Sequence, residues 1–347
     1  MNLVNIRQSY ALNSQDNFPG DAIMTDDTSR RDIFKGAAVA GLAAAATPAF
    51  AQGAAPLADP KTKYPSQPFP EQRQKWPALQ RNMHPVPDCG EASYRGSGRL
   101  AGRKALVTGG DSGIGRAAVI AFSREGADVA INYFPTEEPD AQDVAKLLRA
   151  EGRKVVLIPG DLTDAKFCND LIARANRELG GLDILVNNAA YQQSKESIAE
   201  ISFEQFDRTM KTNVYAMFHL CKAAIPLMKP GAAIINTASV NSVSPEKELL
   251  DYASTKGAIL IFTKALAKQL AKQGIRVNAV GPGPIWTPLQ VAGGQLPGKM
   301  GEFGQDTPLG RAGQPAELAG LYVALADPSD SYTTGSFFGA NGGTGAS

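Results

Sequence analysis

Apolar residues follow two alternating patterns between residues 100 and 347. Short runs are apolar at almost every position, whereas longer stretches carry an apolar residue at every third or fourth position. The first pattern predicts a strand buried on both faces, and the second predicts an amphipathic helix. The predicted strands are 103–109, 128–133, 154–160, 183–189, 232–239, 276–283 and 335–339; the predicted helices are 110–127, 140–152, 163–180, 202–228, 250–273 and 315–326.

This alternation predicts an α/β fold for residues 100–347. Strands without a polar face need helices on both sides, and crossovers between parallel strands are right-handed. We therefore expect a single Rossmann-type domain, a doubly wound parallel sheet of about seven strands. Seven strands leave no room for a separate substrate domain.

Residues 52–99 show neither period and are rich in proline, which prevents most regular pairing. The simplest interpretation is a disordered linker. Apolar residues interspersed along the segment favour instead an extended arm that docks on its own domain or on a neighbouring subunit. These residues are Tyr64, Phe69, Trp76, Leu79 and Met83.

Residues 1–51 resemble a twin-arginine export signal. Arg30 and Arg31 precede an apolar residue and Lys35, an Ala/Gly-rich stretch follows, and an Ala-x-Ala sequence ends at Ala51. The resemblance implies cleavage after Ala51 and a periplasmic enzyme that is exported folded. The alternative is an alanine-rich helix with two chance arginines, on a cytoplasmic protein.

Composition narrows the function classes. The chain has 347 residues, of which 43% are hydrophobic, and a net charge of +1, so no strong field attracts nucleic acid. No apolar run reaches the length of a membrane span. Three scattered cysteines and two histidines predict no disulfide framework, no metal site and no Ser-His-Asp triad.

A glycine-rich turn joins the first predicted strand to its helix. Glycines there allow a tight turn and let the backbone approach a pyrophosphate, which the amides of the helix N-terminus then face. The turn predicts a dinucleotide site formed by Gly109, Asp111, Ser112, Gly113, Ile114 and Gly115.

Three residues downstream carry acid–base chemistry. Tyr252 and Lys256 are four residues apart, so on a helix they share one face, and Ser239 follows the apolar run 232–238. A nearby ammonium stabilises a phenolate and lowers its pKa, and a neighbouring hydroxyl can hold a carbonyl oxygen while the proton moves. We therefore expect the pKa of Tyr252 to be lowered.

The glycine-rich turn, Ser239 and the Tyr-x-x-x-Lys sequence together resemble the short-chain dehydrogenase/reductase family over about residues 92–347. Among its members the chain looks most like bacterial aldehyde reductases and general-stress or glucose dehydrogenase-like proteins. The resemblance implies that Tyr252 transfers the proton and Ser239 orients the substrate. It also implies that Lys256 lowers the phenol pKa and binds the nicotinamide ribose, and that Asn213 anchors a proton relay.

The same resemblance assigns further cofactor-binding residues. Asp161 and Leu162 match the pair that contacts the adenine, although Asp161 also suits a helix N-cap. Ala190 replaces the glycine that usually ends the fourth strand. Trp286 is unusually large for its place, and either core packing or a substrate wall would explain it. The remaining implied cofactor residues are Tyr133, Asn188, Ala189, Pro282, Gly283, Ile285 and Thr287, besides Tyr252 and Lys256.

The end of the second strand bears on cofactor choice. An acid there binds the ribose 2′-hydroxyl of NAD, but this strand ends Asn132-Tyr133-Phe134 and no acid follows until Glu137. We therefore expect NADP, with NAD as the alternative. Backbone amides and Tyr133 would serve the 2′-phosphate, with Arg116 near enough to add charge.

These features predict an oxidoreductase that transfers a hydride between NADP(H) and an aldehyde, ketone, sugar or secondary alcohol. Two alternatives share the motifs: a nucleotide sensor without turnover and a 3-oxoacyl-thioester reductase. Residues 289–306, which are Gly-rich, are expected to form a mobile lid over the substrate. Surplus apolar residues on two helices predict a homotetramer. Examples are Val214, Met217, Phe218, Leu220, Ile259, Leu260, Phe262 and Leu266.

Overall fold

The computed structural model describes residues 57–66 and 68–345. A seven-stranded parallel sheet forms the centre of this part of the chain, in the order β3-β2-β1-β4-β5-β6-β7. Its strands are β1 (Lys104–Thr108), β2 (Asp128–Tyr133), β3 (Val155–Pro159), β4 (Ile184–Asn187), β5 (Ala233–Thr237), β6 (Arg276–Pro282) and β7 (Phe337–Ala340). The predicted doubly wound α/β fold is confirmed.

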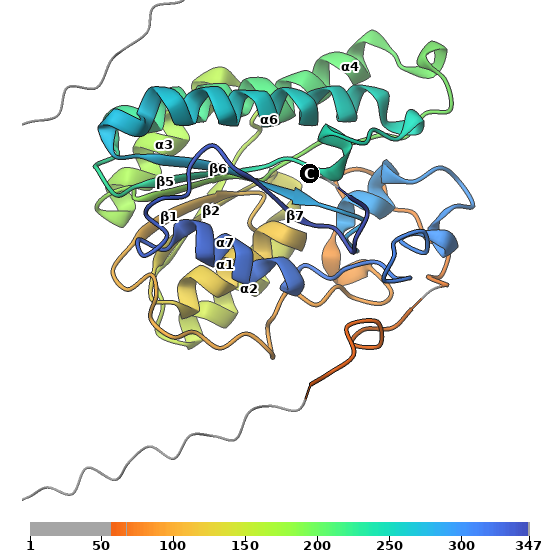
Figure 1. The fold of residues 1–347 in the computed structure, drawn as a ribbon, viewed down its shortest axis with the longest axis horizontal. Helices are drawn as coiled ribbons and strands as arrows, with labels where there is room; N and C mark the ends of the chain where they lie inside the picture. Colours follow the sequence, from red (N-terminus) through yellow and green to blue (C-terminus); the bar gives the residue numbers. More distant parts are fainter. Residues whose placement is uncertain (1–56, 67, 346–347) are drawn as a thin grey trace, which may run out of the picture. The chain divides into compact units, whose positions relative to one another are not determined.

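Helices cover both faces of the sheet, as Figure 1 shows. One face packs against α1 (Gly113–Arg124), α2 (Glu138–Ala150) and α7 (Ala316–Ala326). The other packs against α3 (Ala165–Leu179), α5 (Ala216–Ala224) and α6 (Leu250–Leu270). Within β1, Ala105 and Val107 enter the first core and Leu106 enters the second, which explains why the strand is apolar throughout.

The predicted helix 202–228 is divided in the structure. It begins as α4 (Phe203–Met210), passes through a π-helical turn at Lys211–Tyr215, and continues as α5. Asn213 lies within the π turn. Such turns are rare and occur often at functional sites.

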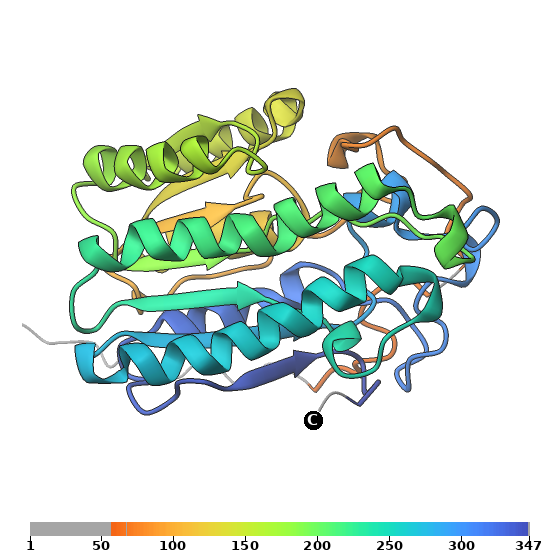
Figure 2. The same ribbon diagram turned by 90° about the horizontal axis from the view of Figure 1, so that it is seen from above.

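The segment 57–99 packs along its own domain. Phe69 stacks face to face on Trp286 with ring centroids 3.9 Å apart, and Met83 is fully buried in the same cluster. In Figure 2 this arm, in orange, runs beside the blue segment 289–306, and the Gln74 amide donates to the carbonyl of Val291 at 3.0 Å. Trp286 is fully buried, and its Nε1 donates to the carbonyl of Pro85, so its role is core packing.

The apolar examples chosen for the tetramer prediction are mostly covered by the chain's own core. Of those eight residues only Phe218 is exposed, because the sheet face beneath α5 and α6 is wide enough to bury the others wholly or partly. Different apolar side chains are exposed on these helices. They are Phe203, Phe206 and Tyr215 near α4 and α5, and Ile261 on α6.

Candidate active site

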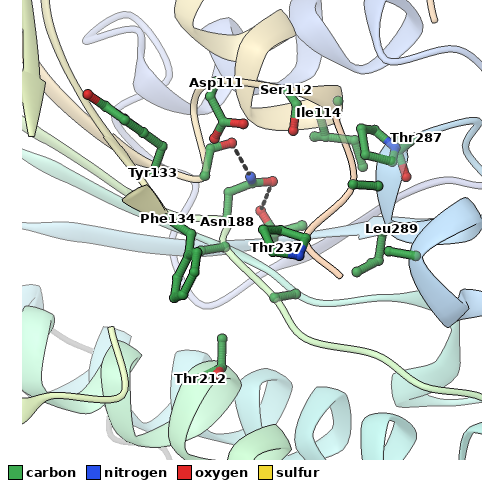
Figure 3. Close-up of a pocket in the computed structure, with 18 of the residues that line it drawn as sticks. Asp111, Ser112, Ile114, Tyr133, Phe134, Asn188, Thr212, Thr237, Thr287 and Leu289 are labelled. Atoms are coloured by element: carbon green, nitrogen blue, oxygen red, sulfur yellow. Dashed lines mark hydrogen bonds between the residues drawn. The ribbon is translucent and has the colours of Figure 1, made fainter. Parts of the chain in front are cut away.

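A single long cleft follows the carboxyl ends of the strands. It crosses the point where the sheet order reverses, between β1 and β4, which is where open α/β sheets bind ligands. One end is lined by residues after β2 and β3, and the other by residues after β5 and β6. We call these the adenosine end and the catalytic end. Figure 3 shows the middle of the cleft, with Asn188 between Asp111 and Thr237.

Glycines allow the loop after β1 to pack closely. A Cβ on Gly115 would lie 1.9 Å from the carbonyl oxygen of Gly109, and one on Gly109 would lie 3.1 Å from the Cα of Ala189. Gly113 has a left-handed φ of +51° and begins α1. The turn therefore brings the first amides of α1 to the cleft, a geometry that suits a pyrophosphate.

Most of the predicted site residues line this cleft. Gly115 and Asn213 do not: Gly115 supports the turn from behind, and Asn213 lines a small neighbouring cavity together with Thr212 and Thr237. The predicted residues in the cleft are Gly109, Asp111, Ser112, Gly113, Ile114, Tyr133, Asp161, Leu162, Asn188, Ala189, Ser239, Tyr252, Lys256, Pro282, Gly283, Ile285 and Thr287.

The catalytic end joins Ser239, Tyr252 and Lys256. Ser239 precedes a short turn after β5, and its side chain lies close enough to the hydroxyl of Tyr252 on α6 to lower the pKa of that phenol. The Nζ of Lys256 lies 5.2 Å from the centre of the Tyr252 ring and donates to the carbonyl of Thr237 at 2.7 Å. All three side chains are buried.

Burial sets the charges of these groups. It raises the pKa of Tyr252 to about 12, against a smaller lowering by the Ser239 side chain, and it lowers the pKa of Lys256 to about 7. The lowered phenol pKa expected from the sequence is therefore not found in this structure. The physical reason is that desolvation disfavours the phenolate and also the ammonium that was expected to stabilise it.

Asn213 joins three elements at the back of the catalytic end. Its Oδ1 accepts from the amide of Tyr191 at 2.8 Å, while its Nδ2 donates to the carbonyl of Tyr191 and to Oγ1 of Thr255, each at 3.0 Å. The π turn allows this side chain to point away from the helix axis toward the loop after β4 and toward α6. Asn213 is thus hydrogen-bonded to Thr255, which lies in the helical turn between Tyr252 and Lys256.

The adenosine end contains the predicted Asp111 and also Glu137, which was not among the predicted cofactor residues. A short turn after Phe134 folds Glu137 back into the cleft wall, where its carboxylate accepts from the Phe134 amide at 3.1 Å. Asp111 is 1% exposed, and its Oδ2 has no hydrogen-bond partner among the described residues. Burial raises the pKa of both carboxyl groups, and each is raised further by the charge of a neighbouring acid.

Two expected phosphate partners are engaged elsewhere. The Nε of Arg116 donates to Glu91 of the arm at 2.8 Å, so its charge is already paired. The hydroxyl of Tyr133 lies 2.5 Å from a carboxylate oxygen of Glu138. Asp161 accepts from the amide of Thr163, whereas the N-cap of α3 is Asp164, so Asp161 is not the helix cap.

The segment predicted as a lid is hydrogen-bonded to the loop after β4. Side chains of Gln192 and Gln193 donate to the carbonyls of Gly294 and Ala292, at 3.2 and 2.7 Å. Leu289 and Ala292 line the catalytic end of the cleft. This segment therefore forms part of the cleft wall in the structure.

The comparisons with known proteins agree with this arrangement. A family model described as enoyl-(acyl carrier protein) reductase matches residues 109–345. The oxidoreductase YhxD of Bacillus subtilis is 59% identical over 278 residues, which cover 79% of this chain and 93% of that protein. The NADPH-dependent aldehyde reductase 1 of Arabidopsis thaliana is 43% identical and covers 77% of this chain and 94% of that protein. A short-chain dehydrogenase from Burkholderia cenocepacia, solved in complex with NADP, is 32% identical with a TM-score of 0.67 and covers 72% of this chain and all of that one.

Proposed function

Because the chain belongs to the short-chain dehydrogenase/reductase family of oxidoreductases, we propose that it transfers a hydride between NADP(H) and a carbonyl or alcohol substrate. The observation that carries this proposal is the meeting of Ser239, Tyr252 and Lys256 in the same cleft as the glycine-rich turn. The closely packed glycines and the unpartnered Asp111 fit a dinucleotide, and the relatives with NADP or NADPH in their names favour the phosphorylated form.

In this proposal the bound nicotinamide supplies or accepts the hydride, and the protein orients the substrate and handles the proton. The hydroxyls of Ser239 and Tyr252 bind the substrate oxygen together. A Tyr252 pKa of about 12 keeps the phenol protonated at neutral pH, so it is ready to donate its proton as an alkoxide forms. In the reduction direction the protonated phenol is the proton donor.

Lys256 and Asn213 have supporting roles. The Lys256 Nζ is held by the carbonyl of Thr237, at the centre of the cleft between the glycine-rich turn and Tyr252. There it would bind the nicotinamide ribose. Asn213 lines the small cavity on the far side of Thr237, where a water would connect Lys256 to solvent and return the proton.

A substrate screen tests the proposal. Purified protein is mixed with NADPH or NADH and with aldehydes, ketones, sugars and a 3-oxoacyl thioester, and loss of absorbance at the reduced nicotinamide band is followed. We expect turnover of at least one carbonyl class, with NADPH preferred. A protein that binds the nucleotide and turns over nothing would be a nucleotide sensor. Turnover confined to 3-oxoacyl thioesters would support the acyl-reductase alternative.

We also propose that the enzyme is exported through the twin-arginine route. The signal at Arg30 and Arg31 lies outside the described residues, so the support is the sequence alone. A folded protein would carry its nucleotide with it, which requires slow dissociation. A reporter fused after Ala51 should reach the periplasm, and replacing both arginines with lysine should keep it in the cytoplasm. A reporter that stays cytoplasmic with both arginines intact would refute export.

Finally, we propose that the protein assembles as a homotetramer through α4, α5 and α6. The support is the set of exposed apolar side chains on these helices: Phe203 is 92% exposed and Ile261 is 65% exposed. Neighbouring exposed apolar side chains on one side of a domain mark an interface. Light scattering at micromolar concentration should give four times the chain mass, and a monomer would contradict the proposal.

A further inference from the structure

The arm brings a tryptophan into the adenosine end of the cleft. Trp76 is half-buried and lines the cleft with the two residues that follow it. Its ring centre lies 4.9 Å from that of Phe134, which follows β2, and 5.3 Å from that of Tyr191, which follows β4. Trp76 therefore lines this end of the cleft and joins the arm to the loops after β2 and β4.

A cation lies against the same ring. The guanidinium of Arg208, on α4, is 4.1 Å from the centre of the Trp76 ring and 3.7 Å from a carboxylate oxygen of Asp161. Its Nε is buried and has no hydrogen-bond partner among the described residues. Arg208 also lines the cleft, together with Asp161 and Leu162. A guanidinium stacked on an indole leaves an outer face of flat, polarizable groups on which a purine can stack.

A second arm residue holds the glycine-rich turn. Gln80 is 2% exposed, and its Oε1 accepts from the amide of Gly113 at 2.7 Å. The backbone amide of Gln80 donates in turn to Asp140 at the start of α2, at 2.5 Å. The Gly113 amide is therefore engaged by the arm, and this contact fixes the position of the turn from which α1 begins.

We propose that Trp76 and Arg208 bind the adenine of the dinucleotide, and that Gln80 is a positioning residue for the turn that holds its pyrophosphate. The inference rests on the proposed function and deepens it. The adenosine end is assigned because Trp76 contacts Phe134, on the β2 side of the sheet reversal, whereas Tyr252 lies on the β5 side. The match to YhxD covers 79% of this chain, which is more than the length of residues 100–347 alone. The similarity to YhxD therefore extends into the arm.

Binding of the two halves of the nucleotide tests the assignment. Calorimetry on the full chain measures Kd for NADP, for adenosine 2′,5′-bisphosphate and for nicotinamide mononucleotide. Stacking of one base on an aromatic side chain typically changes affinity by roughly 5- to 150-fold. We expect Trp76→Ala to weaken NADP and the bisphosphate within that range and to leave the mononucleotide unchanged. Arg208→Gln should act on the same two ligands, by about 2- to 30-fold.

Two controls separate contact with the ligand from general damage. Trp76→Phe keeps a ring and should stay within about threefold of the native Kd. Tyr332→Ala removes a fully exposed aromatic ring elsewhere and should change no Kd. Native circular dichroism and melting temperature are required of each variant. If Trp76→Ala failed to fold, Arg208→Gln would still carry the test.

Kinetics test the role of Gln80. Gln80→Ala loses one hydrogen bond to Gly113, which should raise the KM for NADPH by about 2- to 10-fold while kcat and the substrate KM stay unchanged. Native nucleotide affinity in both Trp76→Ala and Arg208→Gln, or equal losses for the adenosine and nicotinamide halves, would overturn the adenine assignment. An unchanged KM for NADPH in Gln80→Ala would overturn the positioning role. Failure of the native protein to bind any dinucleotide would instead refute the proposed function.

Discussion

The two ends of the cleft are built in different ways. Three of the four residues proposed for catalysis come from one stretch of eighteen residues, Ser239 to Lys256, at the junction of β5 and α6. The adenosine end is assembled from segments far apart in the sequence: the arm, the glycine-rich turn, the loops after β2 and β3, and α4. The comparison suggests that chemistry and nucleotide affinity can be changed separately, and each prediction below tests that separation.

Removal of the proton donor should have the largest effect on turnover. Tyr252→Phe deletes only the hydroxyl beside Ser239, and loss of a positioned general acid costs about 10²–10⁴-fold in rate. Stopped-flow and steady-state assays should show kcat reduced in this range. The Kd for NADP should stay within about twofold. A large loss of nucleotide affinity would show that the two ends are not separable.

Loosening the arm should lower the stability of the fold and have little effect on kcat. Phe69 is 6% exposed and stacks on the fully buried Trp286, so Phe69→Ala leaves a cavity between the arm and the domain. We expect the free energy of unfolding in urea to fall by about 3–5 kcal/mol. Phe69→Leu fills most of the space and should lose less. Native stability in Phe69→Ala would mean that the arm is not anchored there.

The acids of the adenosine end predict a pH dependence of cofactor choice. The pKa values of Glu137 and Asp111 are raised, so both carboxyls are neutral at low pH and become charged as the pH rises. Asp140 and Arg116 also face them and set the local field. Charged carboxylates would repel a 2′-phosphate, so NADP affinity should fall by about tenfold from pH 6 to 9, or ~1.4 kcal/mol.

NAD lacks the 2′-phosphate and is the control for that experiment. Its Kd should change little over the same pH range. Glu137→Gln removes the carboxyl that ionises at the higher pH, so it should flatten the NADP curve near pH 9 and leave the fall near pH 7 that Asp111 causes, with kcat unaffected at saturating nucleotide. If NADP and NAD affinities followed the same pH curve in the native protein, the acids would not control cofactor choice.

The smallest effect is expected at Arg116. Its guanidinium is paired with Glu91, so it is not available to the 2′-phosphate as the sequence suggested. Arg116→Gln should leave the Kd for NADP within about threefold of native, because one mostly buried ion pair on the arm side is exchanged for a hydrogen bond. A loss beyond tenfold would restore Arg116 as a phosphate ligand.

The same contrast explains what the sequence could predict. The strands are predictable because both faces of the sheet are covered, which makes each strand apolar throughout. Ser239, Tyr252 and Lys256 are predictable because they lie within one short stretch of the sequence. Glu137 was placed outside the site because nothing in Phe134–Glu137 signals that the turn folds back. Trp76 and Arg208 meet only through tertiary packing, so no motif marks them. The pKa of Tyr252 is raised mainly by burial, and burial depends on every element packed around the phenol. The four-residue spacing of Tyr252 and Lys256 on one helix does not reveal it.

One chemical measurement tests the central claim directly. The native protein is incubated with NADPH carrying deuterium at both C4 positions of the nicotinamide and with an aldehyde selected by the screen, and the alcohol product is analysed by mass spectrometry. The account predicts one deuterium on the carbinol carbon in the native reaction, and labelled product formed at least about 100-fold more slowly with Tyr252→Phe. Labelled alcohol formed equally by both proteins, or an alcohol product without deuterium, would contradict it.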